Sequence, residues 1–344
     1  MITDIMMSSF PGSRYFGQLG DNNSMVTLHD IRSARARLRS VTVHTPLIEF
    51  KLCDADPRRL FLKPENQQPI GAFKLRGAYN KIASIPEEER KRGVITYSSG
   101  NHAQGVAYAA RALGVRAVIV MPDNAPAIKR EATAELGAEI VTVGPGSAER
   151  QIKAEELAGR HGYVIVPPYN DEYIIAGQGT IGLEILEDLP DVDMVLAPVG
   201  GGGMISGVAT AIKLSKPSVK VVGVEPELAG DAQASFRAGK IVQFSAAEVS
   251  RTIADGLRTQ SIGAINFEHI RRYVDDIFTV TEDEIRQGAK YLNENPATRA
   301  EPSGAVATAG FIFHAAQLPK TKLAVAIVSG GNIDPEMLEE FRRG

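Results

Sequence analysis

The chain has 344 residues, a net charge of −3, 44% hydrophobic residues and a single cysteine, Cys53. This composition excludes an internal disulfide, argues against a nucleic-acid-binding surface, and leaves no apolar run of the roughly 18 residues that a membrane span needs. The first residues also lack the basic stretch and apolar core of a signal peptide, so we expect a cytoplasmic protein, and the length favours two domains.

The hydrophobic pattern along the chain indicates alternating helices and strands. Residues 1–25 are polar and glycine-rich and are predicted to form a flexible tail, and 28–41 has the period of an amphipathic helix. The predicted strands are 93–98, 116–121, 138–143, 163–168, 194–199, 220–225, 276–281 and 323–329. Continuous apolar strands that alternate with helices indicate an α/β fold with parallel sheets, in which ligands bind at the carboxyl ends of the strands.

The first chemical motif is a lysine in an apolar setting. Lys74 stands between Phe73 and Leu75, after a loop that contains Pro69 and Gly71. A partly apolar pocket lowers the pKa of a lysine and makes its amine a nucleophile. By itself the motif is weak, because most lysines are solvated.

The second motif follows the strand 93–98. Ser98, Ser99, Gly100 and Asn101 precede an alanine-rich helix, and such a turn offers N–H groups and hydroxyls to a carboxylate. The same residues also fit a simple helix N-cap. His102 has no histidine or cysteine at ligand spacing, so a role in metal binding is not expected.

The third motif is a run of four glycines, Gly200 to Gly203, between a strand that ends at Val199 and a helix that begins near Met204. Unobstructed N–H groups at a helix start form a cradle for a phosphate, and the run lacks the lysine of a nucleoside-triphosphate loop. The alternative is a flexible turn, although four glycines cost backbone entropy on ordering.

Two further glycine-containing segments have different interpretations. Gly177, Gly179 and Gly182 match the dinucleotide pattern G-x-G-x-x-G, but no strand runs directly into them, so we predict that they serve helix packing. The fourth motif begins at Ser329, where the last strand ends, and continues with two glycines and Asn332. It places a hydroxyl and tight backbone at the carboxyl end of a strand.

The four motifs, in this order and spacing, resemble the fold-type II pyridoxal-phosphate enzymes, and most closely the serine/threonine dehydratase–serine racemase family. The resemblance covers Thr27 to Asp334 and implies a tryptophan synthase β-like fold with two open, twisted, mostly parallel sheets. It implies a large cofactor-binding domain (26–89 and 171–344), a small mobile domain (90–170), and no C-terminal regulatory domain. A homodimer or higher homo-oligomer is typical of the family.

The resemblance also assigns residues to the cofactor, pyridoxal 5′-phosphate. In the family the lysine at the position of Lys74 forms the Schiff base, and the serine at the position of Ser329 meets the pyridine nitrogen. The asparagine contacts the ring hydroxyl, the aromatic residue before the lysine packs on the ring, and the glycine run holds the phosphate. The implied cofactor-binding residues are Phe73, Lys74, Asn101, Gly200, Gly201, Gly202, Gly203, Met204, Gly256 and Ser329.

The chemistry of these residues favours elimination. A serine hydroxyl leaves the pyridine nitrogen neutral, which shortens the life of the α-carbanion and promotes loss of a β-substituent. Lys74 can act as the general base at the α-carbon. The predicted reaction is dehydration of a β-hydroxy amino acid such as L-threonine or L-serine to a 2-oxo acid and ammonia. The substrate carboxylate would be held by Ser98, Ser99, Gly100, Asn101 and His102.

Three alternatives remain open at this point. Ser99 resembles the serine of the racemase branch, where a hydroxyl opposite the lysine delivers a proton to the other face. Arg150 resembles an arginine of that branch and could pair with a second substrate carboxylate, as in 3-hydroxyaspartate, or could be a solvated helix residue. A non-catalytic phosphate- or nucleotide-binding protein would use the glycine run without needing Lys74.

Two other features belong to the resemblance. The segment VEPELAGDA resembles the family's divalent-cation site, with Glu225 and Asp231 as carboxylates, Ala229 as a carbonyl ligand, and Mg²⁺, Mn²⁺ or Ca²⁺ as the ion. Two carboxylates by themselves more often face solvent. Glu301 and Ser303 are expected to lie next to the cofactor site.

Overall fold

The computed structural model describes residues 25–51, 58–125, 127–144 and 146–343. The predicted tail up to residue 24 and Cys53 therefore lie outside the described residues. No helix in these ranges has the length and apolar character required to cross a membrane.

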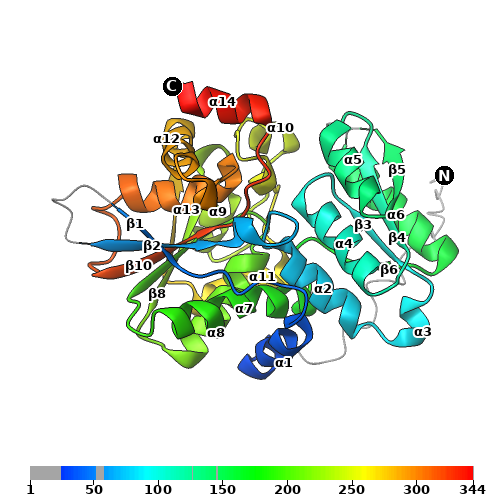
Figure 1. The fold of residues 1–344 in the computed structure, drawn as a ribbon, viewed down its shortest axis with the longest axis horizontal. Helices are drawn as coiled ribbons and strands as arrows, with labels where there is room; N and C mark the ends of the chain where they lie inside the picture. The colour runs from blue at the N-terminus through cyan, green and yellow to red at the C-terminus, as the bar shows by residue number, and fades with distance from the viewer. Residues whose placement is uncertain (1–24, 52–57, 126, 145, 344) are drawn as a thin grey trace, which may run out of the picture.

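The chain forms two sheets, which lie side by side in Figure 1. The six-stranded sheet has the order β1 (Ile48–Phe50), β2 (Arg59–Pro64), β10 (Leu323–Val328), β7 (Met194–Pro198), β8 (Lys220–Pro226) and β9 (Asp276–Val280). The four-stranded sheet has the order β5 (Glu139–Val143), β4 (Ala117–Pro122), β3 (Val94–Tyr97) and β6 (Val164–Ile165). All pairings are parallel except that of β1 with β2. The predicted α/β fold with two mostly parallel sheets is confirmed.

Helices cover both faces of each sheet. The helices are α1 (Leu28–Leu38), α2 (Lys74–Ser84), α3 (Glu87–Arg90), α4 (Asn101–Ala112), α5 (Ala127–Glu135), α6 (Ser147–His161), α7 (Glu172–Asp188), α8 (Gly203–Ser215), α9 (Asp231–Ala238), α10 (Ala246–Val249), α11 (Ala264–Tyr273), α12 (Glu282–Asn293), α13 (Pro302–Phe313) and α14 (Pro335–Arg343). Short 3₁₀ helices complete the described set: η1 (Glu65–Gln67), η2 (Glu227–Ala229), η3 (Asp255–Leu257) and η4 (Pro296–Thr298).

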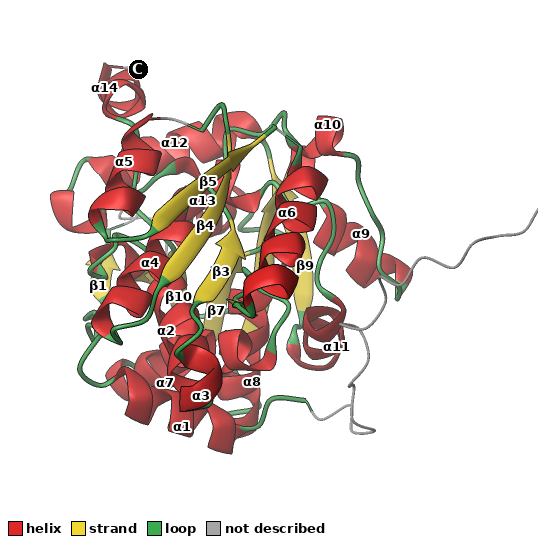
Figure 2. Cartoon of the chain, turned by 90° about the vertical axis from the view of Figure 1, so that its right-hand side faces the viewer, coloured by secondary structure: helices red, strands yellow, loops and turns green. Residues whose placement is uncertain are grey.

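The core divides along the sheets. On the six-stranded sheet, one face packs against α12, α13 and α14, and the other packs against α7, α8 and α11. On the four-stranded sheet, one face packs against α4 and α2, and the opposite face packs against α6, which lies on the near side in Figure 2. Helix α2 lies between the two sheets and contacts both α4 and α7, so the helix that begins at Lys74 is buried from both sides.

The structure extends the sequence prediction in two places. Strand β2 includes Arg59 and the fully buried Lys63, and these charges hid it among the apolar runs. Helix α7 begins well before the predicted segment, because the Asp171 side chain accepts hydrogen bonds from the backbone N–H groups of Tyr173 and Ile174.

The glycines that match the dinucleotide pattern serve helix packing, as predicted. A Cβ on Gly177 would lie 2.6 Å from the carbonyl oxygen of Arg76 on α2, and a Cβ on Gly179 would lie 2.9 Å from that of Gly207 on α8. These contacts are too close for any side chain, so the glycines let α7 approach both neighbours.

Candidate active site

Lys74 lies at the start of α2, against the end of β10. The backbone N–H of Phe73 donates to the carbonyl of Ser329 over 3.1 Å, which joins the lysine motif to the serine motif. The Lys74 amine donates to the carbonyl of Pro168 over 2.9 Å and lies 5.2 Å from the centre of the Phe73 ring. Burial lowers the pKa of Lys74 to about 8, as the apolar neighbours predicted.

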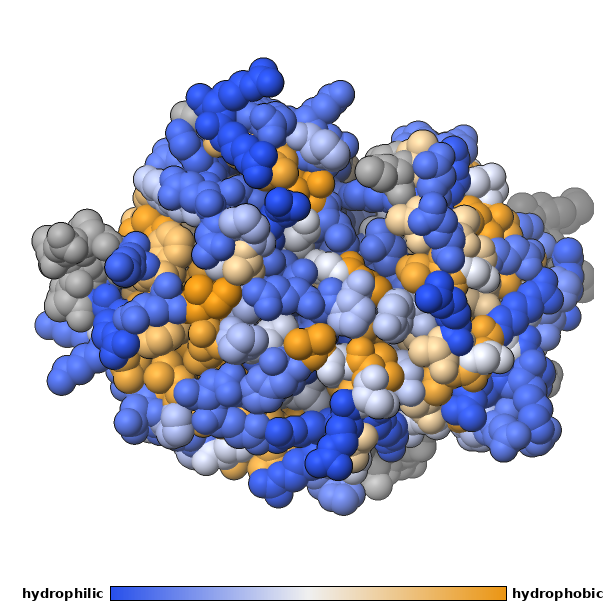
Figure 3. Space-filling view, in the orientation of Figure 1, coloured by the Kyte–Doolittle hydropathy of each residue, from blue (hydrophilic) through white to orange (hydrophobic). Residues whose placement is uncertain are grey.

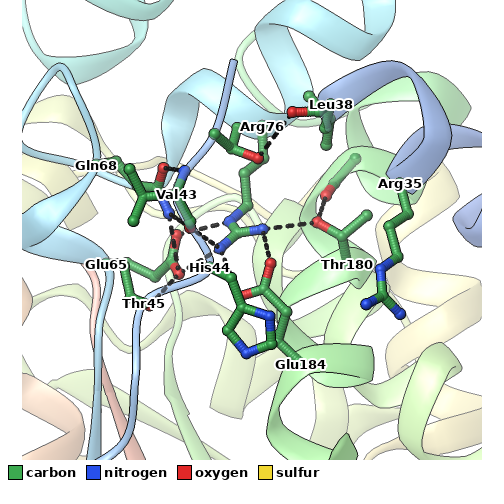
Figure 4. A network of polar contacts seen from close by, with 12 residues as sticks. Arg35, Leu38, Val43, His44, Thr45, Glu65, Gln68, Arg76, Thr180 and Glu184 are labelled. Carbon is green, nitrogen blue, oxygen red and sulfur yellow. Dashed lines mark hydrogen bonds and ion pairs between the residues drawn. The ribbon is translucent and has the colours of Figure 1, made fainter. Parts of the chain in front are cut away.

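A buried ion network fixes the helix that carries Lys74 (Figure 4). The guanidinium of Arg76 donates to both oxygens of Glu65 over 2.7 Å, and to the two oxygens of Glu184 over 2.6 and 2.9 Å. Lys63 adds a second cation 2.6 Å from Glu184. Because these two cations and two carboxylates are almost fully buried, they can remain charged only while they remain together.

The second motif lies at the end of β3 and the start of α4. Asn101 donates through Nδ2 to Glu301 over 2.6 Å, and its Oδ1 accepts from Asn332 over 2.7 Å. A Cβ on Gly105, one turn along α4, would lie 3.3 Å from the carbonyl carbon and oxygen of Lys74. The motif is therefore packed directly against the lysine motif.

The serines and the histidine of this motif differ in exposure. Ser98, Ser99 and Gly100 are partly exposed, and the Oγ of Ser98 accepts from the N–H of Gly100 over 3.4 Å. His102 is buried, with Nε2 3.0 Å from the Val166 carbonyl, and burial, with a smaller effect of the Lys74 charge, lowers its pKa to about 3. His102 is thus a neutral core residue here, and its contact with substrate stays a prediction.

The glycine run connects β7 to α8 through a tight turn. Gly202 has φ +90°, a left-handed conformation, and a Cβ on Gly201 would overlap the Tyr169 ring. Because α8 begins at Gly203, the N–H groups of its first turn have no acceptor within the helix. This arrangement forms a place where a phosphate fits.

The start of α13 connects the remaining predicted cofactor residues. The Oγ of Ser303 accepts from the N–H of Gly256 over 2.9 Å, and the carbonyl of Ser303 accepts from the Oγ of Ser329 over 3.4 Å. A Cβ on Gly200 would lie 3.2 Å from the Cα of Leu257, so the segment at Gly256 also touches the glycine run. Lysine, asparagine, glycine and serine motifs therefore form one continuous group of contacts.

This group lies where the four-stranded and six-stranded parts meet. Lys74 and Ser329 come from segments around the large sheet, and Asn101 follows a strand of the small one. Figure 3 shows the surface hollowed between these two parts on one face of the molecule. The predicted site residues Met204 and Gly203 belong to the first turn of α8 on the same side.

The predicted metal ligands form a separate cluster. Glu225 lies near the end of β8, Ala229 ends η2 and Asp231 begins α9, and all three are buried. Glu225 accepts from the N–H groups of Ala232 and Gln233 over 3.1 and 2.8 Å, whereas neither carboxylate oxygen of Asp231 has a hydrogen-bond partner of good geometry within the described part of the chain. Burial raises the pKa of Glu225 well above its usual value and that of Asp231 to about 7.

Arg150 lies in the first turn of α6. This helix covers the face of the four-stranded sheet opposite to α4. The guanidinium is partly buried, and burial lowers its pKa. Its pairing with a second substrate carboxylate stays a prediction.

Sequence reasoning missed three contributors to the site: Pro168, Tyr169 and Asn332. Pro168 accepts from Lys74, and Tyr169 packs on the glycine run. Both follow the very short strand β6, and their position after a strand end was the available signal. Asn332 stood in the fourth motif, but only the fold shows that its side chain meets Asn101.

Comparison with known proteins identifies the family. Residues 39–330 match the model described as pyridoxal-phosphate dependent enzyme. The chain is 45% identical to the L-threonine ammonia-lyase of Thermotoga maritima (92% of this chain, 78% of the relative). It is 40% identical to the L-threo-3-hydroxyaspartate ammonia-lyase of Saccharomyces cerevisiae (90% and 94%).

Solved structures give the same result. A threonine deaminase, its source abbreviated T.th., superposes with a TM-score of 0.84 at 41% identity, covering 90% of this chain and 99% of that one. Serine racemase from maize superposes with a TM-score of 0.87 at 37% identity, covering 92% and 97%. The chain therefore belongs to the fold-type II pyridoxal-phosphate-dependent enzymes, in the serine/threonine dehydratase–serine racemase family.

Proposed function

We propose that the protein removes the β-hydroxyl and the amino group of a β-hydroxy amino acid, giving a 2-oxo acid and ammonia. L-threonine and L-serine are the first candidate substrates. The observation that carries the proposal is the contact group around Lys74, in which a buried amine, a phosphate cradle and a ring-facing serine converge. Pyridoxal 5′-phosphate, when bound, supplies an electron sink for the α-carbanion.

The residues present fit this cofactor. The glycine run and Met204 would hold the phosphate through the first turn of α8, and Asn101 and Ser329 would contact the ring. The Lys74 amine, with a pKa of about 8, is poised to hold or release a proton near neutral pH. Ser98, Ser99 and Gly100 would orient the substrate carboxylate at the start of α4.

Racemisation is the second candidate activity, and Ser99 is its residue. Ser99 is partly exposed at the end of β3, one residue before the glycine that leads into Asn101. A hydroxyl here would serve a proton to the α-carbon from the side opposite Lys74. Relatives named as a threonine ammonia-lyase, a hydroxyaspartate ammonia-lyase and a serine racemase make both reactions worth assaying on one preparation.

The Ser99→Ala variant separates the two activities. We expect it to lose racemisation by about 10²-fold or more, because a positioned proton donor contributes that much, while dehydration falls far less. The measurement is 2-oxo-acid formation from L-threonine, L-serine and 3-hydroxyaspartate, with chiral analysis of the unreacted substrate. Equal loss of both activities would contradict the assigned role.

The buried carboxylates at the end of β8 fit a divalent cation. Asp231 has two buried oxygens without partners among the described residues, and hard oxygen ligands suit Mg²⁺, Mn²⁺ or Ca²⁺. Such an ion would be structural or activating. The neighbouring segment offers a route to the cofactor, because the N–H of Gly263 donates to the carbonyl of Gly201 over 3.1 Å.

Cation binding is expected to raise the thermal stability of the protein. At Mg²⁺ concentrations of about 100 times Kd the expected gain is about 2.7 kcal/mol, measured as a shift of Tm between Mg²⁺ and chelator. Asp231→Asn should remove this shift, whereas Asp191→Asn, at an exposed position, should keep it. An identical Mg²⁺ response in the Asp231→Asn variant would rule out this site.

Other parts of the proposal concern organisation. We propose that residues 90–170 form a small domain that closes on the large one to exclude water from the site, and that the protein acts as a homodimer or higher homo-oligomer in the cytoplasm. Small-angle scattering with and without substrate tests the closure. Size-exclusion chromatography with light scattering tests the oligomer.

A further inference from the structure

Glu301 is a buried carboxyl group in contact with the predicted cofactor residue Asn101. It precedes α13, and it is 4% exposed. Its backbone N–H donates to the carbonyl of Gly330 over 3.1 Å, and its Oε1 accepts from Nδ2 of Asn101 over 2.6 Å. The carboxyl group thus lies between the asparagine motif and the serine motif.

The hydrogen-bond network fixes which end of the Asn101 amide faces Glu301. The Nδ2 of Asn332 donates to the carbonyl of Ile70 over 2.9 Å and to the Oδ1 of Asn101 over 2.7 Å. A backbone carbonyl only accepts hydrogen bonds, so Asn332 must present its NH₂ group here, and Asn101 must present its oxygen in return. The NH₂ group of Asn101 therefore points at Glu301.

This contact needs an acceptor at Glu301 but no negative charge. Among the residues that the structure describes, no Lys, Arg or His nitrogen makes an ion pair with Glu301. The charged groups that act on it are Asp255, which opposes its ionisation, and Lys129, which favours it, and these two pair with each other over 2.6 Å. Burial is the largest influence, and the pKa of Glu301 is raised to about 8.

The groups come from both parts of the chain. Asn101 and Lys129 belong to helices α4 and α5 beside the four-stranded sheet, and Glu301 and Asp255 belong to segments packed on the six-stranded sheet. Glu301 with Asn101, and Asp255 with Lys129, are two polar contacts across the same junction.

We propose that Glu301 is a positioning residue that works as a neutral carboxylic acid: it holds the Asn101 amide across the junction of the two parts without placing a charge beside the cofactor ring. At alkaline pH it ionises, and the new negative charge faces Asp255 in a buried setting. The contact across the junction is then weakened. The role toward the cofactor rests on the proposed function of Asn101, whereas the neutral state of Glu301 does not.

Infrared spectroscopy of the holoenzyme tests the neutral state. The difference spectrum of wild type minus Glu301→Gln should contain the C=O stretch of a carboxylic acid at pH 7, and this band should disappear with a midpoint near pH 8. Asp255→Asn should move the midpoint to lower pH, because it removes an opposing charge, and Lys129→Met should move it to higher pH. A carboxylate band at pH 7 in place of the acid band would overturn the proposal.

Cofactor affinity tests the positioning role. Glu301→Ala leaves the Asn101 amide without its acceptor and should weaken cofactor binding about tenfold, whereas Glu301→Gln restores an acceptor and should stay within about threefold of wild type. Dissociation is followed by the visible absorbance of the cofactor during dialysis. Equal weakening in both variants would overturn the role. If the wild type binds no cofactor at all, the proposed function fails, and the infrared band still decides the state of Glu301.

Discussion

Lys74→Ala should abolish turnover of β-hydroxy amino acids, with a loss of at least about 10³-fold. The expected loss combines two roles, since the amine would link the cofactor and act as the base at the α-carbon. The amine is buried at the start of α2, 2.9 Å from the Pro168 carbonyl. The measurement is 2-oxo-acid formation under saturating pyridoxal 5′-phosphate, with the visible spectrum of the purified protein recorded beside it.

A matched surface variant separates this effect from a general loss of lysine. Lys91→Ala removes an exposed amine that pairs with Glu87 and Glu88 on the adjoining short helix, and it should keep activity. The Tm of Lys74→Ala should not fall, because the change removes a buried amine rather than an apolar contact. Substantial turnover by a folded Lys74→Ala variant would refute the catalytic assignment and favour the non-catalytic binding protein.

The motifs were visible in the sequence because each one combines a strand end with an unusual local composition. Four successive glycines after an apolar strand are costly to order unless close contacts require them, and the structure places a helix start and the Tyr169 ring against them. The packing role of Gly177 and Gly179 was also predictable, because no strand runs into them. These inferences needed only local pattern and the rules for ligands in α/β folds.

Contacts between distant segments were not predictable in the same way. The hydrogen bond from Asn101 to Glu301 joins residues that are 200 positions apart, and no periodicity relates them. Strand β2 was missed for a related reason, since Lys63 breaks its apolar run and is neutralised by Glu184 from α7. His102 was assigned to the substrate because of its neighbours in the chain, and only the fold shows the Val166 carbonyl as its partner.

Arg76→Met should destabilise the protein by about 3–5 kcal/mol, the largest stability effect that we expect from a single substitution. The side chain is fully buried and donates to Glu65, Glu184 and the Oγ1 of Thr180 (Figure 4). Removing it leaves two buried carboxylates with Lys63 as the remaining cation of the network. An uncompensated buried charge costs several kcal/mol, and urea unfolding of wild type and variant measures the loss.

Two further variants show whether charge or packing causes this loss. Arg76→Met combined with Glu65→Gln restores a neutral network, so it should be more stable than Arg76→Met alone. Arg35→Ala removes a second arginine from the same region, but its pair with Glu187 is nearly half exposed, so its cost should be about 0–1 kcal/mol. If the double variant were less stable than the single one, lost packing would be the cause. The four charges would then not be what holds α2, and with it Lys74, in place.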